Sequence, residues 1–197
     1  MNHGCRKCRR EGIKLFLKGE KCFLPKCPVA TRPFPPGQHG PSSYTKLSEY
    51  GKQLREKQKV RKIYGISETQ LRNYYKKASS KTGDTSENLI QLLESRLDSI
   101  IYRLGVSPSK STVRQMVSHQ FFKVNGRIVN IASHLITLKH EISINENKSV
   151  KFESNTNLPS WISLDAKTSR VKLKNLPNKS EIELPFDVNL VIEYYSR

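Results

Sequence analysis

The sequence predicts an α+β fold, in which a basic, cysteine-containing extension precedes a small helical domain and a module that joins an αα-hairpin to a β-hairpin and short strands. Three observations predict it. Residues 45–117 place apolar side chains at the three-and-four spacing of helices that bury one face. Residues beyond 120 alternate apolar and polar side chains in short runs, as strands do. All four cysteines lie within the first 27 residues.

The charge of the chain predicts a polyanionic partner. The 197 residues include 35 Lys and Arg against 17 Asp and Glu, which gives a net charge of +18 and an isoelectric point of about 9.9. Residues 1–66 hold 16 of the cations and only 4 of the acids. Such a field attracts phosphate backbones. No apolar run approaches the length of a membrane span and no signal-peptide pattern opens the chain, so we expect a soluble protein of a reducing compartment.

The N-terminal segment, residues 1–44, carries the cysteines as Cys5-x2-Cys8-x13-Cys22-x4-Cys27. Two close pairs separated by a short loop are typical of a tetrahedral four-thiolate site, so the expected cofactor is one structural zinc ion. The interleaved cations should help to hold the thiolates deprotonated and should surround the metal with phosphate-binding charge; they are Arg6, Lys7, Arg9, Arg10, Lys14, Lys18, Lys21 and Lys26. Two disulfides, a site that has lost its metal and an iron–sulfur cluster are the alternatives that the spacing leaves open. Few apolar residues accompany the cysteines, so we expect metal binding to be coupled to folding.

A proline-rich stretch follows and cannot form a helix or a central strand. It spans residues 32–41 and reads RPFPPGQHGP. We expect an extended tether that lies along another surface.

Residues 45–88 predict two helices. The first, over residues 47–64, has a thin apolar stripe among many cations. A helix this polar gains little from core packing, so we expect a partner to cover it, with a solvated surface helix as the alternative. Residues 67–70, Ser-Glu-Thr-Gln, form a capping box that opens the second helix. Gly83 and Asp84 end it.

Residues 89–131 predict two more helices and a hairpin. The first helix runs from Leu89 to Leu104, with Gly105 as a left-handed C-cap. Ser109 caps the second helix, and residues 124–127, Val-Asn-Gly-Arg, predict a type I′ turn. The cations of this stretch should point outward and form the electrostatic footprint of a polyanion site, with a merely solvated face as the alternative. They are Arg96, Arg103, Lys110, Arg114, Lys123 and Arg127.

The C-terminal segment, residues 132–197, predicts short strands at 142–144, 150–152 and 171–173. The single Trp, Trp161, should pack in the core. Residues 190–195 form an apolar strand or helical turn that should dock on an earlier part of the chain. Carboxylates are scattered singly and no nucleophile stands beside a histidine, so the sequence predicts no enzyme.

Several motifs in order resemble the bacterial-type small-subunit ribosomal protein S-four family. They are CRKCRREG at 5–12, LFLKGE at 15–20, RPFPPGQHG at 32–40, SEYGKQLREKQK at 48–59, RLD at 96–98, YRLG at 102–105, RQMVSH at 114–119 and VNG at 124–126. The resemblance covers nearly the whole chain. One departure follows Gly40, where many members carry a basic cluster and this chain has PSSYT and then Lys46.

The resemblance implies a structural rRNA-binding protein of the small ribosomal subunit, in the cytoplasm or in an organelle. Such a protein nucleates assembly of the 5′ domain of small-subunit rRNA and contributes to translational accuracy near the site where mRNA enters. The implied partners are small-subunit rRNA and ribosomal proteins S-five and S-three, with mRNA at the entry channel left open, and neither a membrane nor a homo-oligomer is implied. The implied domains are 1–44, then 45–88 completed by a returning segment 181–197, with 89–180 as an inserted RNA-binding module.

The resemblance also implies particular residues. Zinc occurs in those members that keep all four thiols, which this chain does with Cys5, Cys8, Cys22 and Cys27. The implied rRNA contacts are Arg9, Arg10, Lys18, Arg32, Gln38, His39, Gln53, Arg55, Lys59, Arg61, Arg96, Lys110, Arg114, Ser118, His119 and Arg127.

Two other functions fit parts of the sequence less well. An RNA-modifying enzyme with the same module would need a catalytic domain, for which 197 residues leave no room. A zinc-finger regulator of DNA should place a recognition helix after its metal ligands, where this chain has the proline-rich tether.

Overall fold

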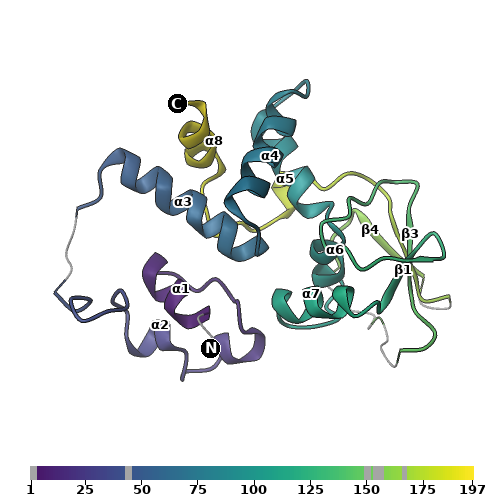
Figure 1. Cartoon of the computed structure of the whole chain (residues 1–197), viewed down its shortest axis with the longest axis horizontal. Helices are drawn as coiled ribbons and strands as arrows, with labels where there is room; N and C mark the ends of the chain where they lie inside the picture. Colours follow the sequence, from purple (N-terminus) through teal and green to yellow (C-terminus); the bar gives the residue numbers. More distant parts are fainter. Residues whose placement is uncertain (1–3, 43–45, 149–151, 153–157, 166–167) are drawn as a thin grey trace. The chain divides into compact units, whose positions relative to one another are not determined.

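The computed structural model describes residues 4–42, 46–148, 152, 158–165 and 168–197 (Figure 1). The chain forms two compact units: residues 1–77 with 184–197 make the first, and residues 78–183 make the second. The C-terminal residues thus rejoin the unit that contains the N-terminus. The three-part division implied by the resemblance draws its boundaries elsewhere and stays a prediction.

The first unit is helical. Its longest described helix is α3 (Glu49–Tyr64). The helix ends at Gly65, whose φ of 61° gives the left-handed C-cap that glycine adopts without strain. The capping box of the next helix is confirmed, because Ser67 and Gln70 each donate a backbone N–H to the other's side chain. The helices described in this unit are α1 (Gly4–Glu11), a 3-10 turn η1 (Gly19–Cys22), α2 (Pro28–Thr31), α3 (Glu49–Tyr64), α4 (Glu68–Ser79), whose end crosses into the second unit, and α8 (Val188–Ser196).

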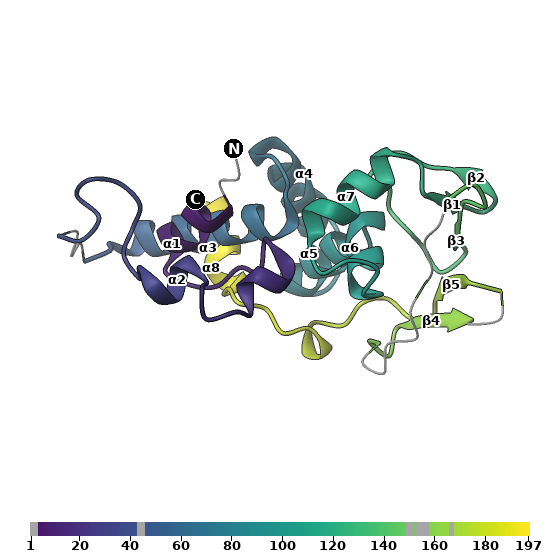
Figure 2. The same cartoon turned by 90° about the horizontal axis from the view of Figure 1, so that it is seen from below.

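The polar helix α3 is covered by the end of the same chain. In Figures 1 and 2 α8 lies against α3, so the segment predicted as a strand or a helical turn is a helix that docks on an earlier part of the chain. Gln53 of α3 donates to the Glu193 carboxylate over 2.9 Å, and the Lys57 ammonium lies 4.3 Å from the centre of the Tyr194 ring. The partner expected for α3 is therefore α8.

Glu68, the first residue of α4, bonds to side chains of both α3 and α8. Its carboxylate accepts from the Tyr195 hydroxyl at 2.7 Å and pairs with Lys57 at 3.0 Å and Arg61 at 3.2 Å. Burial raises the pKa of Glu68, but the hydrogen bonds from Tyr195 and Lys57 and the charges of Lys57 and Arg61 outweigh it, so its pKa lies below the ordinary value. The same bond and burial raise the pKa of Tyr195.

The second unit packs helices against a five-stranded antiparallel sheet with strand order β2-β1-β3-β5-β4. Asn125 (φ 49°) and Gly126 (φ 77°) form the tight turn between the first two strands, which confirms the type I′ prediction. The elements are α5 (Thr85–Glu94), α6 (Leu97–Arg103), α7 (Lys110–Ser118), β1 (Phe122–Val124), β2 (Arg127–Ile128), β3 (Glu141–Ile144), β4 (Ile162–Asp165), β5 (Arg170–Leu173) and a 3-10 turn η2 (Lys179–Glu181).

The core of this unit is apolar and continuous. Ile100 of α6, Val113 of α7 and Phe122 of β1 are fully buried together with Trp161, which confirms the prediction for the single Trp. The strands expected at 142–144 and 171–173 are present as β3 and β5. The strand expected at 150–152 falls on Val150 and Lys151, which lie outside the described residues. The strand β4 was not predicted.

The single helix predicted from Leu89 to Leu104 is wrong, because the structure has two helices with a break at Ser95 and Arg96. A short bridge to the segment around Leu135 interrupts the helix. Ile136 donates its N–H to the Ser95 carbonyl over 2.8 Å, and Leu97 donates to the His134 carbonyl over 2.9 Å. The three-and-four spacing of apolar residues continues through the break, because α5 and α6 each bury an apolar face. The spacing alone therefore does not show the break. Gly105 has the predicted left-handed conformation, with φ of 75°.

Candidate RNA interface

The proline-rich tether is held against α1 by Arg9. The guanidinium donates from Nε to the Phe34 carbonyl over 3.0 Å and lies 4.8 Å from the centre of the Phe34 ring. Arg9 therefore fastens residues 34 and 35 to the N-terminal helix, as expected for a tether that lies along another surface. Gln38 and His39, further along the tether, are exposed.

A cationic hollow of about 420 Å³ opens beside α1 and α2. Three predicted rRNA contacts, Arg9, Lys18 and Arg32, line it, and the structure brings them together with Arg6 and Lys21. Arg6 and Lys21 were not among the predicted rRNA contacts, although the cations between the cysteines were expected to supply phosphate-binding charge. Cys5, Pro28 and Thr31 complete the lining and no carboxylate belongs to it. Five cations around one hollow suit the oxygens of a phosphate backbone. We call this site the cationic hollow.

The predicted contacts on α3 also take part in the fold. Gln53 is buried and bound to Glu193. Arg55 pairs with Glu11 at 3.4 Å, Lys59 pairs with Glu56, and Arg61 pairs with Glu68. The side chains of Arg55 and Arg61 are 31% and 30% exposed and that of Lys59 is 14% exposed, so the two arginines are the more accessible to a phosphate.

Arg96 requires a correction. Its side chain is fully buried, and its guanidinium donates to both carboxylate oxygens of Asp98, at 2.9 and 2.7 Å. The expectation that it points outward to RNA is wrong. The bridge to Leu135 turns the backbone at this position, and Asp98, two residues later, supplies the buried counter-charge.

Of the other contacts predicted in the second unit, Ser118, His119 and Arg127 are exposed, whereas Lys110 and Arg114 are half-buried. The Ser118 hydroxyl donates to the Arg114 carbonyl within α7 over 3.0 Å. Lys110 lies 5.5 Å from the centre of the Tyr102 ring. Burial lowers the pKa of Lys110 to about 8, against the attraction of Glu94 and Asp98.

Lys110 should make stability depend on pH. Its pKa is about 8 in the folded chain against an ordinary value of 10.5, so between these values the unfolded chain binds more protons and stability rises with pH. We expect Lys110→Met to remove that part of the rise, because methionine does not titrate. Urea unfolding followed by Trp161 fluorescence at several pH values measures the difference. The exposed Lys139→Met is the control, and parallel profiles for wild type and Lys110→Met would contradict the expectation.

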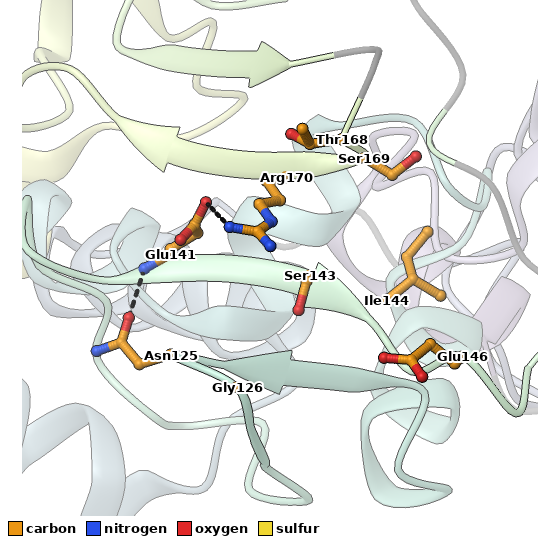
Figure 3. Close-up of a pocket in the computed structure, with 9 residues that line it drawn as sticks. All are labelled: Asn125, Gly126, Glu141, Ser143, Ile144, Glu146, Thr168, Ser169 and Arg170. Atoms are coloured by element: carbon orange, nitrogen blue, oxygen red, sulfur yellow. Dashed lines mark hydrogen bonds and ion pairs between the residues drawn. The ribbon is translucent and has the colours of Figure 1, made fainter.

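A second hollow lies on the sheet and has a different character (Figure 3). In it the Asn125 carboxamide oxygen accepts the Glu141 N–H at 2.8 Å, and Arg170 reaches the Glu141 carboxylate at 3.5 Å. Glu146 adds another carboxylate to the lining. None of the predicted rRNA contacts lines this hollow. Its two carboxylates disfavour a phosphate backbone, so the cationic hollow is the better candidate interface.

The four cysteines do not form the predicted metal centre in this structure. All four are free thiols, and three of them are buried. Within the described part of the chain, which includes all four, no three His, Cys, Asp or Glu side chains lie close enough together to hold a metal ion. Burial raises the pKa of Cys8, and the charges of the other three cysteines add to it against a hydrogen bond with the Leu15 backbone.

No helix in the described residues is both long and apolar enough to span a bilayer.

Comparison with known proteins identifies the family. Residues 1–94 match a family described as the ribosomal protein S4/S9 N-terminal domain, and residues 95–142 match the S4 domain. The chain is 47% identical over 201 residues to small ribosomal subunit protein uS4 of Caldicellulosiruptor bescii, covering 98% of this chain and 96% of that one. The protein of the same name from Dictyoglomus turgidum is 48% identical with the same coverage, and that from Nitrosomonas eutropha is 44% identical over 100% and 98%. The chain therefore belongs to the ribosomal protein uS4 family.

Proposed function

We propose that this chain is a structural constituent of the small ribosomal subunit that binds small-subunit rRNA and catalyses no reaction. The observation that carries the proposal is the cationic hollow, in which five Arg and Lys side chains gather without a carboxylate. The family supports it, since the relatives are named as small ribosomal subunit proteins. The chain would reside in the ribosome.

The mechanism is phosphate neutralisation combined with recognition of a folded RNA shape. Cations that replace condensed counterions supply most of the affinity and make it depend on salt. The deep, narrow major groove of A-form RNA hides base edges from side chains, so a folded junction is recognised by its backbone geometry. The proposed contacts are the predicted ones other than the buried Arg96 and Gln53: Arg9, Arg10, Lys18, Arg32, Gln38, His39, Arg55, Lys59, Arg61, Lys110, Arg114, Ser118, His119 and Arg127.

The more specific roles rest on the family resemblance. They are nucleation of 5′-domain assembly, contact with ribosomal proteins S-five and S-three, and a contribution to accuracy where mRNA enters the subunit. The 89–180 module would then act as one RNA-binding part and the N-terminal extension as another.

Equilibrium binding to a transcript of the small-subunit rRNA tests the proposal. Affinity should fall linearly on a logarithmic scale with salt concentration, with a slope that counts the neutralised phosphates. A large-subunit rRNA transcript is the matched competitor. Equal affinity for both transcripts would contradict specific binding to small-subunit rRNA.

We also propose that the four thiols bind one zinc ion when the metal is supplied. In support, Cys8, Cys22 and Cys27 are free thiols and are buried with 4–6% of their surface exposed, and the charges of the other three cysteines act on Cys8. Zinc selects thiolate ligands and releases their protons, so it would reverse the raised pKa of Cys8 and couple binding to local folding.

Metal analysis of protein purified under reducing conditions should find about one zinc per chain. Cys8→Ser should lose the metal and also loosen α1, which limited proteolysis would detect. Phe23→Leu is the control, because it changes the residue beside Cys22, keeps all four thiols and should keep the metal. A metal-free wild type would overturn the site.

A further inference from the structure

Two partly exposed aromatic rings, Phe16 and Phe23, stand close in the sequence to Lys18 and Lys21, which line the cationic hollow. The Phe16 and Phe23 ring centres are 5.1 Å apart with a tilt of 33°. Phe23 is 71% exposed and Phe16 is 37% exposed. A pair of phenylalanine rings normally buries a large apolar area, so this pair leaves most of its apolar surface available to a partner.

The backbone holds Phe16 in an unfavourable conformation. Its φ is 50°, in the left-handed region that bulky side chains rarely adopt. Such conformations cost energy and cluster at functional sites. With 37% of its surface exposed, Phe16 is not a core residue, and in this conformation its ring lies against Phe23.

The charged residues near the two rings in the sequence indicate what kind of partner would cover them. Lys18 stands two positions after Phe16 and Lys21 two positions before Phe23, and both lysines line the cationic hollow. Lys26, three positions after Phe23, is exposed as well, and Glu20 is the acid of this stretch. A partner that covers the rings must therefore bring a flat apolar face together with nearby negative charge. An unpaired nucleotide has both.

We propose that Phe16 and Phe23 form a stacking platform for an unpaired base of RNA whose phosphates lie against Lys18 and Lys21. Unstacked bases of loops and junctions bind proteins by stacking on aromatic side chains, and the stacking tolerates any base. The inference rests on the proposed function and deepens it, because it makes a single-stranded nucleotide part of the recognised RNA.

Binding to the small-subunit rRNA transcript at several salt concentrations separates stacking from charge. Phe23→Leu keeps an apolar side chain but removes the ring. Affinity should therefore fall by about 5- to 150-fold, and the salt slope should not change. Lys21→Ala should instead lower the slope by about 1. The neighbouring Leu24→Ala, at a residue that is 52% exposed, is the matched control and should bind as wild type does. Phe23→Tyr should also retain affinity.

Two further variants guard against a folding artefact. Phe16→Gly removes a ring where glycine adopts the observed φ without strain, and that relief offsets part of the lost apolar contact, so the variant should weaken binding with only a small change in thermal stability. Phe23→Trp adds an exposed indole to a chain whose one Trp is buried. RNA should quench its added fluorescence, which is measured against wild type.

The outcomes are distinct. If wild type binds the transcript and Phe23→Leu and Phe16→Gly bind equally well, the platform is wrong and the proposed function stands. If both variants bind RNA normally but enter small subunits poorly, the rings contact a protein and the platform is again wrong. If wild type itself does not bind the transcript, the proposed function and the platform both fail.

Discussion

Replacing Asp98 by alanine should lower the free energy of unfolding of the second unit by about 3–5 kcal/mol. Asp98 accepts both hydrogen bonds from a guanidinium that is fully buried. Its loss takes from the buried Arg96 the carboxylate that accepts these two hydrogen bonds, which costs far more than the loss of an exposed ion pair. Urea unfolding followed by Trp161 fluorescence measures the effect, because Trp161 lies in the core of the same unit.

Two controls separate the buried pair from charge in general. Glu146→Ala removes a carboxylate that is 90% exposed and paired to Lys123, and it should change stability by no more than about 0.5 kcal/mol. The double variant Arg96→Met/Asp98→Leu removes both charges together and should recover much of the loss. If Asp98→Ala were as stable as Glu146→Ala, the buried pair would have no structural role.

Removing three cations of the cationic hollow should produce the largest loss of RNA binding. In the variant Lys18→Ala/Lys21→Ala/Arg32→Ala, each lost phosphate contact should reduce the salt slope by about 1, so the slope should fall by about 3. Affinity at low salt should fall with it, and equilibrium binding to the small-subunit rRNA transcript measures both. The physical reason is that fewer counterions are released when the RNA binds.

A charge-matched variant is the control for the second prediction. Lys139→Ala/Lys172→Ala/Lys174→Ala removes the same charge from the second unit. It should weaken binding less and reduce the salt slope by less than the cationic-hollow variant does. The reason is that it lowers the net positive charge without removing any proposed phosphate contact. Equal losses in the two triple variants would show that only the net charge matters and would contradict the assignment of the cationic hollow.

Local signals predicted local structure well. The Ser67 capping box, the Asn125-Gly126 turn and the Gly105 cap each form as expected, because their conformations depend on a few neighbouring residues. The burial of Trp161 also follows from its side-chain type. These features need no knowledge of distant parts of the chain.

Features that depend on distant partners were missed or wrong. The break between α5 and α6 comes from a bridge to Leu135, about forty residues away in the sequence, and the same bridge turns Arg96 inward. A cation at a helical surface position and a cation in a buried pair look alike in sequence. The predicted rRNA contacts included Arg9, Lys18 and Arg32 but not Arg6 and Lys21, which folding brings to the same hollow.

Sedimentation of a cell lysate through a sucrose gradient tests the central claim most directly. The tagged chain, expressed in the organism it comes from, should travel with the small ribosomal subunit and remain there after washing at moderate salt. Footprinting of the small-subunit rRNA in those fractions should show protection that the Lys18/Lys21/Arg32 variant loses. A chain that stays at the top of the gradient, free of the small subunit, would contradict the claim.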